Sequence, residues 1–153
     1  MRCGIRFEVM PPRLLRAHRR TRYSTLGTVV RVGRCVPDAL FAQIGAREAV
    51  FVTAWNPRSR RMPLGWNVRM QRRLAERLRR FEVAPADGTL GRWHEAHLLV
   101  AADVRRVLRI ARIFRQLGVV AMRRGRPARL VLLRQSTPFC ARVTCARCAA
   151  APP

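Results

Sequence analysis

The sequence contains no lysine and few acidic residues. Its Lys and Arg total 32, all of them arginine, and they face only 8 Asp and Glu in 153 residues, so the formal net charge is +24. A GC-rich genome favours arginine codons, but that bias alone does not remove aspartate and glutamate. Arginine forms bidentate hydrogen bonds with phosphate and stays charged at any working pH. The imbalance therefore favours a polyanionic partner, nucleic acid first, and leaves genomic background as the alternative.

The basic charge is not confined to one arm of the chain. Residues 1–47 carry ten Arg and two acids, and residues 48–134 carry twenty Arg and six acids. The charge is therefore a property of the whole domain.

Long apolar runs are absent as well. No run approaches the length of a membrane span, and the first eight residues contain no apolar stretch of signal-peptide length. We therefore expect a cytoplasmic protein without membrane association. The hydrophobic fraction of 49% predicts a packed interior, and 153 residues fit one domain.

The cysteines do not form a recognisable site. There are five, an odd number without a signal peptide, which argues against a disulfide framework. Cys140, Cys145 and Cys148 have the spacing of plant-type iron–sulfur ligands, but no fourth cysteine follows them. His94 and His97 lie three apart in a predicted strand and should point to opposite faces. We predict no metal and no cofactor.

Hydrophobic periodicity predicts a single α+β domain over residues 1–134. In its first part, residues 13–25 are an Arg-rich segment that we expect to be helical after two prolines, and 28–32 form a strand. Residues 39–44 form a short helix, and 50–54, apolar on both faces, form a central strand. Residues 135–153 are predicted to be a disordered tail, or an over-extended reading of GC-rich DNA.

The second part alternates helices and strands. We predict a helix from Asn67 to Arg80, with Asn67 as its N-cap, and then a strand over 81–84 that ends at Pro85. A second strand over 93–101 follows. The remaining elements are a helix capped by Asp103 and strands over 119–122 and 128–133. From Val50 the order is β-α-β-β-α-β. We therefore predict a ferredoxin-like core, with an additional N-terminal strand and short helix, and with helices packed on one face of a mainly antiparallel sheet.

A set of motifs resembles a known family. They are Thr53-Ala54-Trp55-Asn56-Pro57 with Ser59, Asn67 with Leu74 and Leu78, Trp93 and Glu95 before Leu98-Leu99-Val100, and Phe114-Arg115-Gln116 before Val119-Val120-Ala121. Over about residues 20–134 the chain resembles the bacterial family catalogued as domain of unknown function 3293. The resemblance implies a small cytoplasmic domain and no known reaction.

The chain departs from the family pattern at two places. Arg115 stands where the resemblance implies glycine, and Ala96-His97 stands where it implies serine after the glutamate. We therefore carry over to this chain no family role that requires this serine.

Arginine rows on two predicted helices give the first hypothesis for function. The rows follow helical spacing and consist of Arg69, Arg73, Arg77, Arg105, Arg109 and Arg112. Like charges at this spacing repel, and a polyanion would relieve that repulsion. In a ferredoxin-like layer both helices lie on one side of the sheet. The rows can then form one surface for a nucleic-acid backbone, without sequence readout.

A pocket is the second hypothesis. The residues that match the family and lie near strand ends are Trp55, Asn56, Ser59, Asn67, Trp93, Glu95 and Gln116. Glu95 is the candidate general acid or base, with His94 or His97 assisting, and the asparagines would orient a substrate. The same residues also suit ordinary roles as turn, cap and core residues. A third hypothesis is a protein-interaction domain or homo-oligomer whose charge is incidental.

Overall fold

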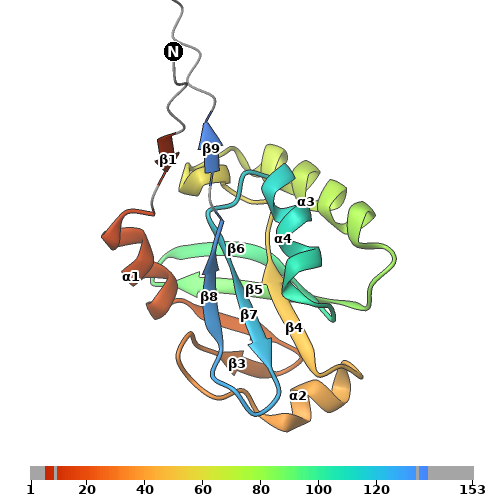
Figure 1. Cartoon of the computed structure of the whole chain (residues 1–153). Helices are drawn as coiled ribbons and strands as arrows, with labels where there is room; N and C mark the ends of the chain where they lie inside the picture. The colour runs from red at the N-terminus through yellow and green to blue at the C-terminus, as the bar shows by residue number, and fades with distance from the viewer. Residues whose placement is uncertain (1–5, 9, 134, 138–153) are drawn as a thin grey trace, which may run out of the picture.

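The computed structural model describes residues 6–8, 10–133 and 135–137 and has α+β architecture (Figure 1). The main strands are β2 (Arg22–Thr25), β3 (Thr28–Val30), β4 (Glu48–Val52), β5 (Val83–Leu90), β6 (Trp93–Val100), β7 (Gly118–Arg123) and β8 (Arg129–Leu132). They form one antiparallel sheet in the order β3-β2-β5-β6-β4-β7-β8. A separate pair joins β1 (Arg6–Glu8) to β9 (Gln135–Thr137).

Four α-helices and one short 3₁₀-helix connect these strands within the described residues. They are α1 (Pro12–Arg20), α2 (Asp38–Gln43), η1 (Pro57–Ser59), α3 (Leu64–Leu78) and α4 (Val104–Ile113). In the described ranges, none of the helices is long and apolar enough to cross a membrane.

Strand β4 lies at the centre of the structure. It pairs with β6 on one side and β7 on the other, and Phe51 and Val52 are each 1% exposed. Successive side chains of a strand point to opposite faces, so a strand that is apolar throughout must be covered on both. The predicted central position and two-sided burial of the strand over 50–54 are therefore confirmed for β4.

The two faces of the sheet carry separate cores. On one face, Leu74 of α3 and Val107 of α4 pack with Val50 and Val52. On the other, Phe41 of α2 packs with Phe51. The expectation that all helices lie on one face is therefore wrong for α2. The physical reason is the double-sided burial of β4, which needs a second cover.

The N-terminal segment differs from the predicted single helix over 13–25. It divides into α1, which contains no fully buried residue, and β2, in which Tyr23 and Thr25 are buried. Strand β2 pairs with both β3 and β5 and so extends the sheet beyond the β5-β6 hairpin. Tertiary pairing with β5 overrides the polar composition of the segment.

The β5-β6 hairpin is longer than expected. Strand β5 continues through Pro85 to Leu90 and pairs with all of β6, so the predicted break at Pro85 is wrong. Proline has no N–H to give to a neighbouring strand. The β2 pairing reaches only Ala86, and the carbonyl of Pro85 accepts a hydrogen bond from Thr25 Oγ1 at 2.8 Å. Proline is tolerated there because β2 requires no N–H from it.

Two predicted caps have different outcomes. Asp103 caps α4 by accepting a hydrogen bond from the backbone N–H of Arg105 at 2.7 Å, as predicted. Asn67 is not a cap, because α3 begins at Leu64 after Pro63, which leaves Asn67 buried inside the helix. Its amide is used in a tertiary contact instead.

The predicted tail lies mostly outside the described residues. Gln135–Thr137 form β9, whereas disorder was expected from residue 135. Residues 138–153, with Cys140, Cys145 and Cys148, are outside the part of the chain that the structure describes. Cys35 is exposed and free.

Substitution of Gly88 by alanine should destabilise the protein by about 1–3 kcal/mol, because a Cβ atom there overpacks the core. An ideal Cβ would lie 2.7 Å from Cε1 of His97, whose side chain is buried. The free energy of unfolding in urea measures the effect. Gly65→Ala on α3 is the control, since its Cβ meets nothing closer than 4.0 Å. Equal stability of the two variants would contradict this packing.

Candidate functional site

A hydrogen-bond network around Asn56 joins the loop after β4, the start of α3 and strand β6. Asn56 Nδ2 donates to Glu95 Oε1 at 2.8 Å. Its Oδ1 accepts from the backbone N–H of Met62 at 2.9 Å and from Asn67 Nδ2 at 3.1 Å, and its backbone N–H donates to Asn67 Oδ1 at 3.0 Å. The Asn56 side chain therefore ties three elements together.

The backbone of this loop is strained. Asn56, Arg58 and Ser59 have φ values of 46°, 53° and 57°, in the left-handed region that non-glycine residues seldom adopt. Such conformations persist only where the surroundings hold them, and they gather at functional sites. The backbone N–H of Arg58 donates to the carbonyl of Arg115 at 3.0 Å. Arg115 itself has φ of 54°, a conformation that suits the glycine implied by the resemblance.

Three side chains fix the backbone before the loop. Gln116 Nε2 donates to the carbonyl of Trp55 at 3.0 Å, and Gln71 Oε1 accepts from the backbone N–H of Ala54 at 2.9 Å. Thr53 Oγ1 donates to the carbonyl of Ala96 at 2.7 Å and accepts from the N–H of Trp55 at 3.0 Å. The end of β4 is thus held in place from several sides.

Glu95 lies on the wall of a cavity of about 310 Å³, between α1, β2 and the β5-β6 hairpin. Burial raises the pKa of the Glu95 carboxyl group above its ordinary value. Hydrogen bonds from the Asn56 and Trp93 side chains oppose this shift without cancelling it. Glu95 therefore holds its proton to a higher pH than an exposed glutamate.

Three other titratable side chains line the same cavity. His18 Nδ1 and Tyr23 Oη lie 3.1 Å apart, and burial lowers the pKa of His18 and raises that of Tyr23. His97 Nδ1 lies 3.0 Å from the backbone carbonyl of Glu95, so Nδ1 is the donor. Burial lowers the pKa of His97 to about 4. Both histidines are thus neutral near pH 7.

The predicted pocket residues divide between two cavities that share Trp93. Ser59, Trp93 and Glu95 line the first cavity. Trp55, Asn56, Asn67 and Trp93 line a second, of about 290 Å³. Gln116 lines neither, but it borders a space of about 20 Å³ together with Asn56, Ser59 and Glu95. The Asn56–Glu95 hydrogen bond is where the two groups of residues meet.

The two histidines of β6 lie apart. His97 is buried beside Glu95, whereas His94 is exposed, and its Nε2 pairs with Asp87 Oδ1 at 2.9 Å. The structure therefore places only His97 at the Glu95 cavity. In the described parts of the chain, no group of three or more His, Cys, Asp or Glu is arranged to hold a metal ion.

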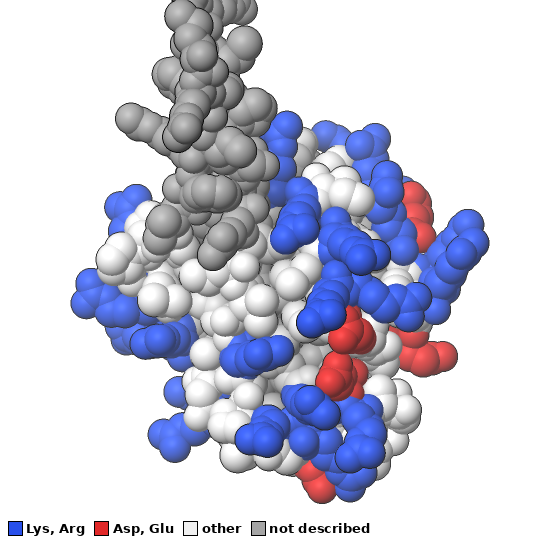
Figure 2. Space-filling model, in the orientation of Figure 1, with Lys and Arg blue, Asp and Glu red and all other residues white. Residues whose placement is uncertain are grey.

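The predicted arginine rows are exposed on α3 and α4, which cover the same face of the sheet. Figure 2 shows arginine side chains crowded over this part of the surface with few acids among them. The arginines of the described ion pairs are Arg123, with Glu48, and Arg124, with Asp38. None of the six arginines in the rows takes part in an ion pair of the described residues.

Sequence reasoning missed His18 and Tyr23. Both belong to the segment predicted to be helical, although Tyr23 is the one tyrosine of the chain and lies in a short stretch of alternating polarity. That alternation was the available signal for a strand.

The predicted pocket residues all lie between positions 52 and 119, and comparison with known families singles out the same segment. Residues 52–119 match the family described as Protein of unknown function (DUF3293). The resemblance is confirmed for this segment, which is shorter than the expected range of about 20–134. The DUF3293 segment contains Asn56, Asn67 and Glu95 but not α1 or β2. No curated protein and no solved structure matches the chain.

Proposed function

We propose that the Glu95 cavity binds a small polar molecule and that the Glu95 carboxyl group exchanges a proton or hydrogen bond with it. One observation carries this proposal: a partly buried carboxyl group, held by Asn56 at 2.8 Å, lies on the wall of a cavity of about 310 Å³. Concave sites with an apolar lining and a few converging polar groups are typical of ligand pockets. A perturbed pKa in such a site also indicates function.

The lining of the cavity favours an uncharged ligand. Leu14, Ala17 and Leu90 provide apolar surface, and His18 and His97 are neutral near pH 7. Among the described residues that line the cavity, none is arginine, although the chain has 32. An anion would therefore lose its hydration without gaining a charged partner.

The polar groups of the cavity supply acid and base functions. A carboxyl group with a raised pKa is protonated to a higher pH and can donate its proton. Because His97 Nδ1 donates to a backbone carbonyl, its Nε2 is left as an acceptor. A ligand with both a donor and an acceptor matches this pair.

Glu95→Gln should abolish the thermal stabilisation that a cavity ligand gives the protein. The change keeps the shape but removes the titratable proton. A thermal-shift screen with small, uncharged polar metabolites measures this stabilisation. Compounds that raise the Tm of the unmodified chain should leave the Tm of Glu95→Gln unchanged. Glu82→Gln, at an exposed position, is the control and should respond like the unmodified chain. Equal responses of all three proteins would contradict the proposal.

We also propose that the α3/α4 arginine surface, formed by Arg69, Arg73, Arg77, Arg105, Arg109 and Arg112, binds a nucleic-acid backbone. The supporting observation is that six exposed arginines on α3 and α4, the two helices that cover one face of the sheet, lack ion pairs among the described residues. Release of counterions by phosphate contacts would drive such binding.

A triple variant tests this surface. Arg105→Gln/Arg109→Gln/Arg112→Gln should weaken binding to labelled DNA or RNA and reduce the slope of log affinity against log salt by about 3. The control removes the same charge elsewhere, at the exposed positions Arg31, Arg34 and Arg47. If both triple variants lose the same affinity, the charge acts nonspecifically and the surface is not a site.

We further infer that β4-α3-β5-β6-α4-β7 is a ferredoxin-like unit. Support comes from the β-α-β-β-α-β chain order and from the antiparallel β5-β6-β4-β7 neighbours, with α3 and α4 on one face. Strands β2, β3 and β8 then extend this unit at its edges.

A further inference from the structure

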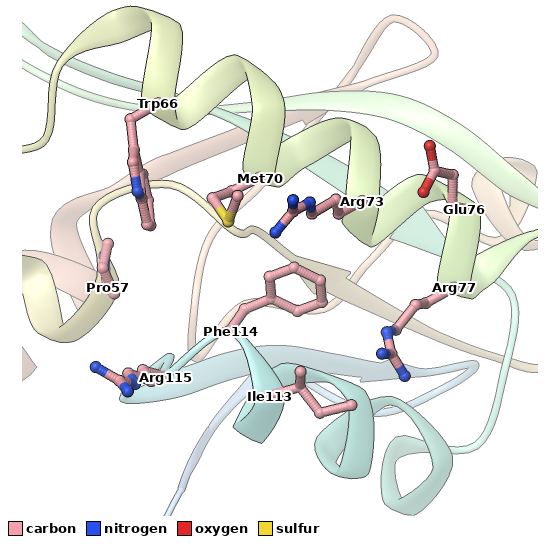
Figure 3. A pocket seen from close by; sticks show the side chains of 9 residues that line it. All are labelled: Pro57, Trp66, Met70, Arg73, Glu76, Arg77, Ile113, Phe114 and Arg115. Atoms are coloured by element: carbon pink, nitrogen blue, oxygen red, sulfur yellow. The ribbon is translucent and has the colours of Figure 1, made fainter.

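A cleft of about 490 Å³ lies between α3 and the end of α4 (Figure 3). We propose that it takes a base of a single-stranded nucleic acid. This proposal rests on the α3/α4 arginine surface proposed above, and it specifies which kind of nucleic acid that surface binds.

The cleft has an apolar lining. Trp66 and Met70 of α3 line it together with Ile113 and Phe114 at the end of α4, and Figure 3 shows Trp66 over Pro57 and Met70 over Phe114. Trp66 is partly exposed, and Ile113 is 54% exposed on an otherwise basic helix surface. Aromatic side chains within a basic groove are the usual platform on which unpaired bases stack.

The rim of the cleft is positively charged. Arg73, Arg77 and Arg115 line it together with a single acid, Glu76. In Figure 3 the Arg73 guanidinium group reaches into the space between Met70 and Phe114. Arginine binds phosphate through a planar fork and also stacks on rings. The cleft therefore offers contacts to both the phosphate and the base of a nucleotide.

Further arginines lie near the cleft along both helices. Arg69 is one turn before Arg73 on α3, and Arg109 and Arg112 lie in the last turns of α4 before Ile113, outside the cleft lining. Flanking phosphates of a strand would contact these residues, whereas a free nucleotide would not. A paired base cannot leave its duplex without a cost in stacking and pairing energy. A single strand therefore satisfies both the cleft and the rows.

The test compares four ligands by fluorescence anisotropy and competition at one salt concentration. They are a labelled oligothymidine of about 12 nucleotides, a duplex of the same length, heparin, and thymidine monophosphate. We expect the single strand to bind the full chain most tightly. Trp66→Ala should weaken binding of the strand by about tenfold, and leave duplex and heparin binding unchanged. Val68→Ala is the control, on the same helix, 46% exposed and outside the cleft lining.

A second variant distinguishes the loss of base stacking from a folding defect in Trp66→Ala. Trp66→Leu keeps apolar volume but removes the stacking face, so it should also weaken binding of the single strand selectively. If neither Trp66 variant affects that binding, or if the duplex binds as tightly, the base-binding proposal is overturned while the arginine surface stands. If thymidine monophosphate binds as tightly as the strand, the single-strand proposal is overturned, because flanking phosphates then add nothing. If no nucleic acid binds, both proposals fail.

Discussion

Asn56→Ala is expected to lower the free energy of unfolding by about 3 kcal/mol or more. The change removes the Asn56 partner of Glu95 Oε1 at 2.8 Å and of the Met62 N–H at 2.9 Å, whereas Asn67 Nδ2 keeps the Met62 carbonyl at 3.3 Å. A polar group left unpaired in the interior costs about 1–3 kcal/mol. Alanine also tolerates the φ of 46° less well than asparagine does. Urea denaturation measures the loss.

Asn56→Gly separates the loss of hydrogen bonds from the cost of the left-handed backbone conformation. Glycine removes the same side chain but accepts a left-handed backbone, so this variant should be more stable than Asn56→Ala by about 1 kcal/mol. A loss below about 1 kcal/mol in Asn56→Ala would show that the network does not hold the loop.

The free energy of unfolding should fall by about 3 kcal/mol between pH 6.5 and about pH 4 because of His97. Burial lowers the pKa of His97 from 6.5 to about 4. Between these values the unfolded chain binds a proton that the folded chain does not. The stability from His97 is therefore complete above pH 6.5 and is lost as the pH falls toward 4.

Two neighbours modify this pH dependence. The lowered pKa of His18 acts in the same direction, and the raised pKa of Glu95 acts in the opposite direction. Comparison of the unmodified chain with His97→Gln isolates the contribution of His97. In this variant, the loss of unfolding free energy between pH 6.5 and pH 4 should be smaller by about 3 kcal/mol. Parallel stability curves for the unmodified chain and His97→Gln would contradict the burial of a neutral histidine.

Local patterns predicted much of the second half of the fold. The spacing of Leu74 and Leu78, the cap at Asp103 and the apolar β4 segment each carry their own signal within a few residues. Elements whose conformation depends on distant partners were read incorrectly. Strand β2 needs β5, and the passage of β5 through Pro85 depends on where β2 stops. No window of sequence contains that information.

The candidate site was predicted by resemblance rather than by periodicity. The family motifs identified Asn56, Asn67 and Glu95, and the structure joins them by hydrogen bonds. Asn67 was read as a cap because asparagine prefers that position. Pro63, which stands just before the helix, was the better signal, and it would have placed Trp66 on α3 as well. His18 and Tyr23 reach the cavity from elements outside the matched segment.

The Glu95 cavity is tested most directly by proton–nitrogen correlation NMR of the labelled chain, titrated with acetamide and phenol as small, uncharged polar probes. Binding in the cavity predicts amide shift changes concentrated at Ser59, Gly88, Glu95 and His97, and their loss in Glu95→Gln. Shift changes scattered over the surface, or unaltered by Glu95→Gln, would contradict a ligand site at Glu95.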